Sequence, residues 1–175
     1  MKNSDSKVFP TPKAGSSHVP QRKWSTMEQS RSHLSGKAVC IHCNATLDDK
    51  RWRFNGARWV KMMMAGDEVR RIVCPACKMQ EEGLVEGVVT VHAAWDDARS
   101  EQASHMLRRE EAREREKNAL QRIVSLEVLK DGLEVTTTTE FLARHLARAL
   151  EKAFHGKLSV QQATGEKYVD ITVNC

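Results

Sequence analysis

Aromatic residues and long apolar runs are scarce in this sequence. Aromatic side chains make up 5% of its 175 residues, whereas charged side chains make up 29%. No stretch approaches the roughly 20 apolar residues of a membrane-spanning helix, and the polar start lacks the apolar segment of a secretion signal. These absences predict a cytoplasmic protein with no membrane partner and with one or two domains of modest core size.

Patterns typical of enzymes are missing too. The seven histidines are scattered, no glycine-rich loop is spaced to hold a phosphate, and no nucleophile lies beside a recognisable base. We therefore expect neither an enzymatic activity nor a small-molecule substrate.

Four of the five cysteines form two short, matching motifs. The first is Cys40-Ile41-His42-Cys43 and the second is Cys74-Pro75-Ala76-Cys77. Each motif places two thiolates on a tight turn, and two such turns supply the four soft ligands of a closed tetrahedral Zn²⁺ site. The sequence thus predicts a structural zinc ion held by Cys40, Cys43, Cys74 and Cys77, with disulfide or redox chemistry as the alternative. Cys175, at the C-terminal end, is expected to be incidental.

The formal net charge of +5 lies in the first 37 residues. Residues 1–37 contain seven Lys or Arg and two acidic residues, whereas the rest of the chain holds 21 of each sign. This segment also has three of the four prolines and no apolar periodicity, which predicts a disordered basic tail. Such a tail favours contact with a polyanion, nucleic acid first, although a merely solubilising tail fits the same composition.

Aromatic and basic residues are interleaved in two places. In the tail, Trp24 of Arg22-Lys23-Trp24 would stack on a base, or would pack back on the zinc domain instead. Between the cysteine motifs, alternation around Asn55-Gly56 predicts a β-hairpin over residues 51–62. One face of this hairpin would cover the zinc core while the basic face contacts phosphate, the alternative being an ordinary ribbon with solvated arginines. The candidate RNA-contacting residues are Arg22, Lys23, Trp24, Arg51, Arg53, Arg58, Trp59 and Lys61.

The charged middle of the chain predicts a boundary between two domains. Residues 38–95 are expected to form the zinc-ribbon domain, closed by the β-branched strand that follows Gly87. Residues 96–120 are expected to form one long helix, because acids at its start suit a helix N-terminus and its charges alternate at helical contact spacing. So charged a helix buries little, which predicts a solvent-crossing connector. Its near-zero net charge disfavours the alternative, an RNA-contacting helix.

Residues 121–175 have the clearest fold pattern. Strands are expected at 123–129 and 133–136, joined by a tight turn at Asp131-Gly132, with a further pair at 158–162 and 168–173. Between the pairs, Thr137 and Glu140 have capping-box spacing and open a helix that Gly156 would end in the left-handed conformation. The predicted class is therefore α+β: a four-cysteine zinc ribbon joined by a long charged helix to a small ββαββ antiparallel-sheet domain.

Several of these motifs, taken together, resemble a known pattern. The set comprises the two cysteine motifs, Arg51-Trp52, Gly83-x-x-x-Gly87, Gln121-Arg122-Ile123, Leu133-Glu134-Val135-Thr136-Thr137-Thr138 and Leu142-Ala143-Arg144. It resembles a small bacterial family of uncharacterised zinc-ribbon proteins over residues from about 38 to 173. The basic tail departs from that pattern, as does Asn118-Ala119-Leu120, where the family has His-Pro-Leu.

More distantly, the layout resembles the N-terminal half of the archaeal and eukaryotic export adaptor of the large ribosomal subunit, which has more cysteine motifs. The resemblance implies association with the ribosome or ribosomal RNA. We therefore expect a non-enzymatic zinc-binding adaptor that associates with the ribosome or structured RNA. The alternatives are a protein-interaction module acting through the C-terminal α+β domain and a DNA-binding regulator that uses the zinc ribbon.

Overall fold

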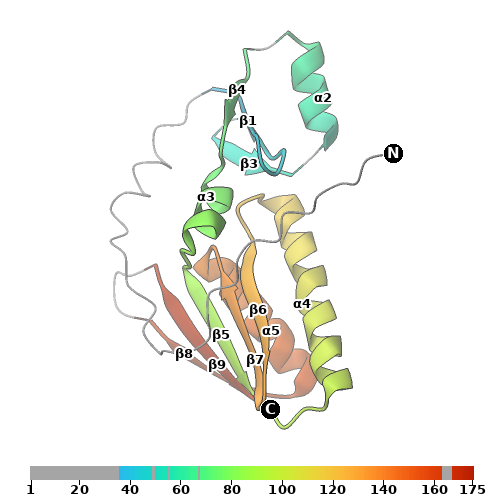
Figure 1. Ribbon diagram of the computed structural model, residues 1–175, viewed down its shortest axis with the longest axis vertical. Helices are drawn as coiled ribbons and strands as arrows, with labels where there is room; N and C mark the ends of the chain where they lie inside the picture. The colour runs from blue at the N-terminus through green and yellow to red at the C-terminus, as the bar shows by residue number, and fades with distance from the viewer. Residues whose placement is uncertain (1–35, 49, 55, 67, 163–166) are drawn as a thin grey trace, which may run out of the picture.

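The computed structural model describes residues 36–48, 50–54, 56–66, 68–162 and 167–175. Two sheets lie one above the other along the long axis of the molecule, with helix α3 between them (Figure 1). We call residues 36–82 the knuckle module and residues 83–175 the sheet domain. The tail residues Arg22, Lys23 and Trp24 lie outside the described residues.

The knuckle module contains a four-stranded sheet in the order β3-β2-β1-β4. Strands β1 and β4 are parallel, and the other neighbours are antiparallel. Its elements are β1 (Ala38–Cys40), β2 (Thr46–Asp48), β3 (Arg51–Arg53), α2 (Gly56–Met64), β4 (Arg70–Ile72) and α3 (Pro75–Glu82).

The expected hairpin over residues 51–62 is wrong. Strand β3 pairs back onto β2, with Leu47 opposite Trp52, and the residues after it form helix α2. Alternation over so few residues fits either structure, and the Ala, Lys and Met residues of this stretch are good helix formers. Asn55 itself lies outside the described residues.

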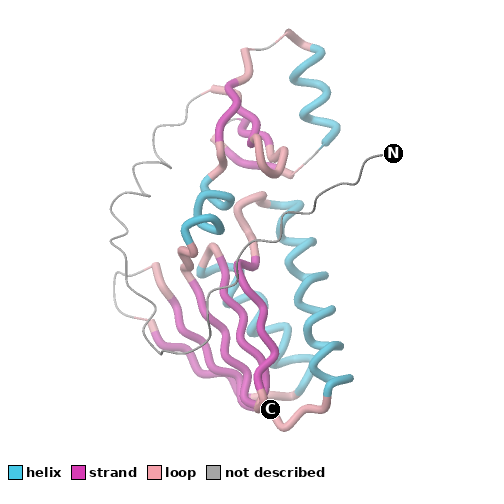
Figure 2. The backbone as a smooth tube through the Cα atoms, in the orientation of Figure 1, coloured by secondary structure: helices cyan, strands magenta, loops and turns pink. Residues whose placement is uncertain are grey.

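The sheet domain contains a five-stranded mixed sheet in the order β6-β7-β5-β9-β8. Strands β5 and β9 are parallel, and the other neighbours are antiparallel. Helices α4 and α5 lie on one face of this sheet (Figure 2). The elements are β5 (Gly87–His92), α4 (Asp97–Lys117), β6 (Ile123–Leu129), β7 (Gly132–Thr137), α5 (Glu140–Phe154), β8 (Lys157–Gln161) and β9 (Val169–Asn174).

Strand β5 was expected to close the zinc domain, and that expectation is wrong. It is the central strand of the five-stranded sheet, between β7 and β9, so the sheet is not a four-stranded ββαββ arrangement and residues 38–95 are not one unit. Gly87 allows helix α5 to lie close to this strand, because a Cβ there would be 2.4 Å from the Cβ of Ala143. A β-branched run predicts a strand but does not identify its partners.

Helix α4 is not a solvent-crossing connector. Ala103 and Leu107 are fully buried in the sheet-domain core, together with Leu142, Leu146 and Leu150 of α5. The helix begins at Asp96, whose Oδ1 accepts a hydrogen bond from the amide of Arg99 at 2.8 Å. Helix α4 is therefore part of the sheet domain rather than a solvent-exposed link between domains.

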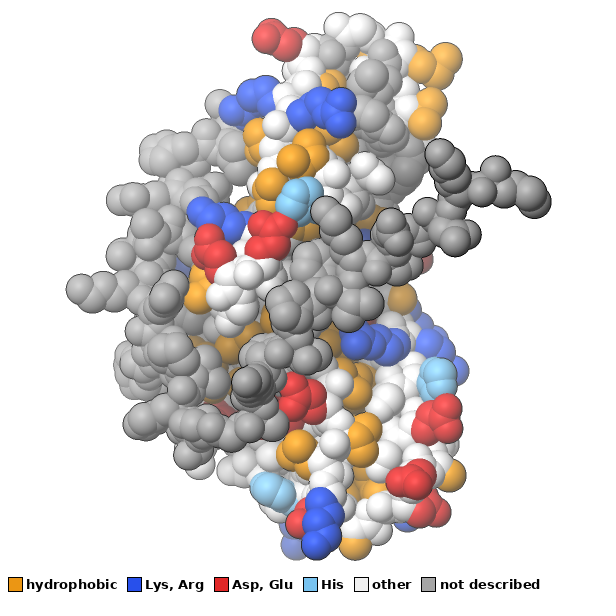
Figure 3. Space-filling view, viewed as in Figure 1, with side chains coloured by type: hydrophobic (Ala, Val, Ile, Leu, Met, Phe, Trp, Pro, Cys, Tyr) orange, Lys and Arg blue, Asp and Glu red, His pale blue; other side chains and the backbone are white. Residues whose placement is uncertain are grey.

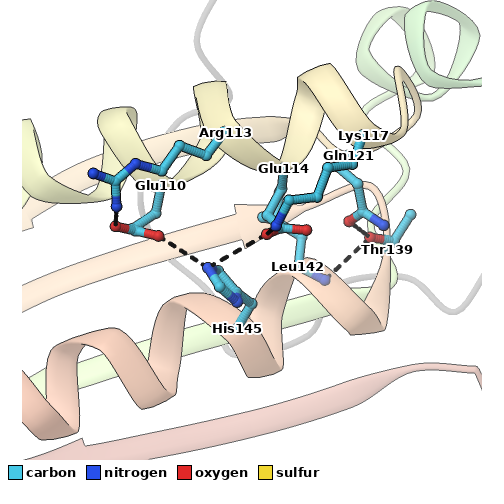
Figure 4. Close-up of polar contacts among 8 residues, drawn as sticks. All are labelled: Glu110, Arg113, Glu114, Lys117, Gln121, Thr139, Leu142 and His145. Atoms are coloured by element: carbon cyan, nitrogen blue, oxygen red, sulfur yellow. Dashed lines mark hydrogen bonds and ion pairs between the residues drawn. The ribbon is translucent and has the colours of Figure 1, made fainter. Parts of the chain in front are cut away.

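Polar contacts hold the charged half of α4 against α5 (Figure 4). The Nε2 atom of His145 lies 3.0 Å from a carboxylate oxygen of Glu110 and 3.8 Å from one of Glu114. Glu114 is 5% exposed and pairs with Lys117 at 2.6 Å. The hydrogen bond with His145 is the main cause that lowers the pKa of Glu110, with a further contribution from Arg113. This docking was not predicted from the sequence, because the two glutamates lie on α4 and His145 lies on α5.

Helix α5 begins two residues later than the capping pattern suggested. Thr139 Oγ1 accepts a hydrogen bond from the amide of Leu142 at 3.2 Å, whereas Thr137 is the last residue of β7. At the other end, His155 rather than Gly156 adopts the left-handed conformation, with φ of 54°. Gly156 is needed for space, because a Cβ there would lie 2.8 Å from the sulfur of Cys175.

Candidate metal centre

The first cysteine motif is a tight turn at the end of β1. The Cys40 amide donates to the Ala45 carbonyl at 2.8 Å, and the Asn44 amide donates to the Cys40 carbonyl at 3.0 Å. Asn44 has φ of 58°, a left-handed conformation that asparagine tolerates better than most residues. This turn carries the side chains of Cys40 and Cys43 on the same side as the second motif.

The second cysteine motif is the start of helix α3. Cys74 caps the helix, and its sulfur accepts a hydrogen bond from the Cys77 amide at 3.4 Å. Pro75 occupies the first helical turn, where its missing N–H costs nothing. The Cys74 amide also donates to the sulfur of Cys40 at 3.3 Å, which ties the two motifs together. Amide donors and a helix N-terminus both favour the thiolate form of cysteine.

The four sulfurs are close enough to coordinate one metal ion. All lie within 4.8 Å of one another, with Cys40 and Cys77 3.8 Å apart and Cys43 and Cys74 3.7 Å apart. A tetrahedron with Zn–S bonds of about 2.3 Å has sulfur–sulfur edges of about 3.8 Å, so the cluster fits that geometry. The same separations exclude disulfide bonds, which are about 2.05 Å long. All four cysteines are free thiols in the structure.

Hydrogen bonds among the clustered thiols shift their pKa values in opposite directions. Hydrogen bonds from Cys74 and then Cys77 lower the pKa of Cys43, and the hydrogen bond with Cys43 raises the pKa of Cys74 to about 12. Hydrogen bonds with Cys43 and Cys74, followed by burial, raise the pKa of Cys77. One thiolate is thus stabilised by protons on its neighbours, so four thiolates together need a positive ion.

Apolar side chains enclose the cluster. Cys40 and Cys74 are fully buried, Cys77 is nearly so, and Leu47 and Trp52 pack in the same core. Ala119 and Leu120, which follow α4, belong to this core as well. Four protein ligands fill a tetrahedral coordination shell and leave no position for solvent, so the arrangement is that of a structural site.

The structure describes only some of the knuckle-module side chains that were expected to contact RNA. Arg51 and Lys61 are exposed, and Arg53 is half-buried. Arg58 and Trp59 lie in helix α2 rather than in a strand, and their side chains lie outside the described part of the structure. Trp52 faces the cysteine core, as the alternation predicted, which places Arg51 and Arg53 on the opposite face of β3.

Three residues near the cluster contact one another in a way that the sequence did not predict. The guanidinium carbon of Arg115 lies 3.9 Å from the centre of the Phe54 ring, and that of Arg122 lies 5.6 Å from it. Arg115 belongs to a charged run that predicted a solvated helix face. Of the three, Phe54 alone lies between the cysteine motifs, so no local pattern joins them.

No known protein family matches this sequence, and no curated protein is significantly similar to it. Within the described ranges, no helix has both the length and the apolar character needed to cross a bilayer. The chemistry of the cysteine cluster therefore rests on its own geometry.

Proposed function

We propose that the protein is a non-enzymatic, zinc-stabilised adaptor that binds structured RNA, with the ribosome as its expected site. Four clustered thiolates form a soft, closed ligand set, which suits Zn²⁺ and leaves no position for substrate. Such an ion would hold the short strands of the knuckle module together, since a sheet of three-residue strands has little core of its own.

The observation that carries the RNA proposal is a separation of charge along the molecule. Residues 1–82 contain 15 Lys or Arg and 8 acidic residues, whereas residues 83–175 contain 13 and 15. The segment of the knuckle module is basic by itself, with nine Lys or Arg and six acidic residues in 36–82, whereas the sheet domain is slightly acidic. A basic module of this kind favours contact with phosphates.

Basic side chains also share one face of the knuckle-module sheet. The strand register places Arg53, Thr46, Val39 and Arg71 in one row, and Arg51 alternates to the same face as Arg53. Figure 3 shows Lys and Arg side chains over this upper sheet. The opposite face packs on the cysteine cluster. Thr46 and Val39 in the middle of the row are buried, so RNA would reach the arginines at the two edge strands, β3 and β4.

The test compares binding of full-length protein to a ribosomal RNA hairpin over a range of salt concentrations. The triple variant Arg51→Gln/Arg53→Gln/Arg71→Gln should reduce the slope of log K against log salt by about two, because each phosphate that a protein neutralises contributes roughly 0.7–0.9 to that slope. The control is Arg148→Gln/Lys152→Gln/Lys157→Gln, which removes three exposed charges from the sheet domain. Equal slopes for both variants and the wild type would refute the proposal.

Sedimentation of tagged protein through a lysate gradient, with and without nuclease, tests the ribosomal part. Co-migration with ribosomal fractions at low salt supports it, and absence from those fractions together with no binding to purified RNA contradicts it. Tighter binding to duplex DNA than to the RNA at equal salt would favour a DNA-binding regulator instead.

A second candidate function is protein interaction through the sheet domain. On the sheet face opposite α4 and α5, Glu127 pairs directly across from Glu134, with Asp170 nearby. Burial is the main cause that raises the pKa of Glu134, and the two other carboxylates add to it. Like charges placed opposite each other weaken a sheet, so a basic partner on this face would relieve the repulsion. This candidate predicts capture of one protein that Glu127→Gln/Glu134→Gln abolishes and that nuclease leaves unchanged.

A further inference from the structure

One buried and one partly buried guanidinium group lie at the junction between the knuckle module and the sheet domain. Arg122, directly before β6, is 5% exposed, and its Nη2 atom has no hydrogen-bond partner among the described residues. Arg115, in the last turn of α4, is partly buried, and its Nε atom also lacks a partner within that part of the chain. A buried cation is costly unless an opposite charge lies close by, so these two groups imply a nearby anion.

Phe54 fixes the position of both cations. Its ring lies under the Arg115 guanidinium at 3.9 Å and within 5.6 Å of that of Arg122. The Nε atom of Arg122 also donates to the Ala119 carbonyl at 2.8 Å, which orients the rest of its guanidinium group. An aromatic face attracts a cation but supplies no counter-charge, so it does not complete the site.

The cysteine cluster is the neighbouring source of negative charge. Arg122 donates to the carbonyl of Ala119, and Ala119 packs in the same core as Cys40 and Cys74. Phe54, which both guanidinium groups approach, directly follows β3, whose Trp52 packs in that core as well. Glu111, one turn before Arg115 on α4, is the other nearby anion. Glu111 is already engaged, because it accepts hydrogen bonds from the Ile123 amide at 2.8 Å and from Arg108 at 3.3 Å. The thiolates of the cysteine cluster are thus the remaining negative groups beside the two arginines.

The charges balance when a divalent ion is bound. Four thiolates and one Zn²⁺ carry two net negative charges, and Arg115 and Arg122 carry two positive ones. We propose that Arg115 and Arg122 neutralise the zinc–thiolate centre and thereby couple zinc binding to the docking of the knuckle module on the sheet domain. The proposal rests on the zinc site under "Proposed function" but not on RNA binding.

Hydrogen bonds around the same junction, one of them donated by the side chain of Gln80, give the coupling a structural route. The Ala119 amide donates to the Trp52 carbonyl at 3.1 Å, and Ala119 is fully buried in the cysteine core. Gln80 of α3 donates to the Ile123 carbonyl at 3.1 Å. Loss of zinc would let thiols of the cluster take up protons, which removes negative charge beside the buried Arg122 and favours opening of this interface.

The test measures how readily zinc passes from full-length protein to a chromogenic chelator. Arg115→Gln/Arg122→Gln should purify with one zinc per chain but release it about 10- to 100-fold more readily, the usual effect of removing partners of metal ligands. The control is Arg109→Gln, an exposed arginine on the same helix, which should behave as wild type. If the double variant does not fold, the single variant Arg115→Gln, at the less buried position, takes its place. It should show a smaller change in the same direction.

Two further results separate charge from packing. Arg115→Lys/Arg122→Lys keeps both charges and should recover part of the zinc retention. In hydrogen exchange, zinc removal should speed exchange of the wild-type amides of residues 119–123, and less so in the double Gln variant. Equal zinc transfer by wild type, control and both Gln variants would overturn the coupling while leaving the zinc site intact. Less than half an equivalent of zinc in the wild type would overturn both.

Discussion

The guanidinium group of Arg115 stacks on the ring of Phe54, with 3.9 Å between the guanidinium carbon and the ring centre. Phe54 belongs to the knuckle module, and Arg115 to the last turn of α4 in the sheet domain. This contact joins the two parts beside the cysteine cluster. The two parts also meet in the cysteine core, where Ala119 and Leu120 pack with Trp52.

Phe54→Ala should destabilise the zinc-loaded protein by about 0.5–1 kcal/mol, the usual value of a partly exposed cation–π contact. Phe54 is 39% exposed, so the apolar burial that its ring loses adds to this value. Urea unfolding measures the change. Phe141→Ala, which removes a 56% exposed ring from α5, is the matched control and should cost less. Equal effects of the two changes would show that the stack contributes nothing.

Cys74→Ser should abolish zinc retention and unfold the knuckle module while the sheet domain stays folded. Within the described part of the chain, the two cores share no residue, and the sheet-domain core contains none of the four cysteine ligands. Hydrogen-exchange mass spectrometry should show fast exchange in residues 36–82 and continued protection in α5. Cys175→Ser, which changes an exposed thiol, should keep both zinc and protection. Retention of a full zinc equivalent by Cys74→Ser would contradict the assignment.

Gly87→Ala should destabilise the protein by about 1–3 kcal/mol, the cost of overpacking a core. The added Cβ would lie 2.4 Å from the Cβ of Ala143, between the central strand and α5. Thermal unfolding checks this value. Adding Ala143→Gly should recover part of the loss, and an unchanged melting temperature for Gly87→Ala would show that β5 is not packed under α5.

Acid should weaken the docking of α4 through Glu110. The folded-state pKa of this carboxyl lies below its ordinary value, mainly because of the hydrogen bond with His145. Its contribution to stability is therefore present above the ordinary pKa of 4.5 and is lost as pH falls through the lower folded-state value.

His145→Gln should thus flatten the fall in unfolding free energy below pH 4.5 and cost up to about 1 kcal/mol at neutral pH. Urea titrations at several pH values measure both effects. His105→Gln is the control, because His105 pairs with Glu101 at an exposed site on α4, the helix that carries Glu110. A pH profile unchanged by His145→Gln would show that His145 does not set the acid sensitivity of this contact.

The cysteine cluster was predictable because its signal is local. Each pair of ligands is set by a four-residue motif, and the chemistry of four thiolates limits how two such motifs combine. The hairpin of β6 and β7 was predictable for the same reason, since Asp131-Gly132 marks the turn between its strands.

The position of β5 could not be predicted from local pattern. Val89 pairs with Val135 and with Ile171, so its neighbours lie far along the chain. Likewise, α4 is held by contacts with His145 of α5, and the buried cation beside the cysteine core belongs to Arg122, far from both cysteine motifs in the sequence. In each case the sequence identifies the element, while a distant residue decides what it packs against.

The most direct test of the zinc site is metal analysis of full-length protein combined with X-ray absorption at the zinc edge. We predict one zinc per chain with four sulfur neighbours at about 2.3 Å. Less than half an equivalent of zinc, or a coordination shell that contains nitrogen or oxygen in place of a cysteine sulfur, would contradict this prediction.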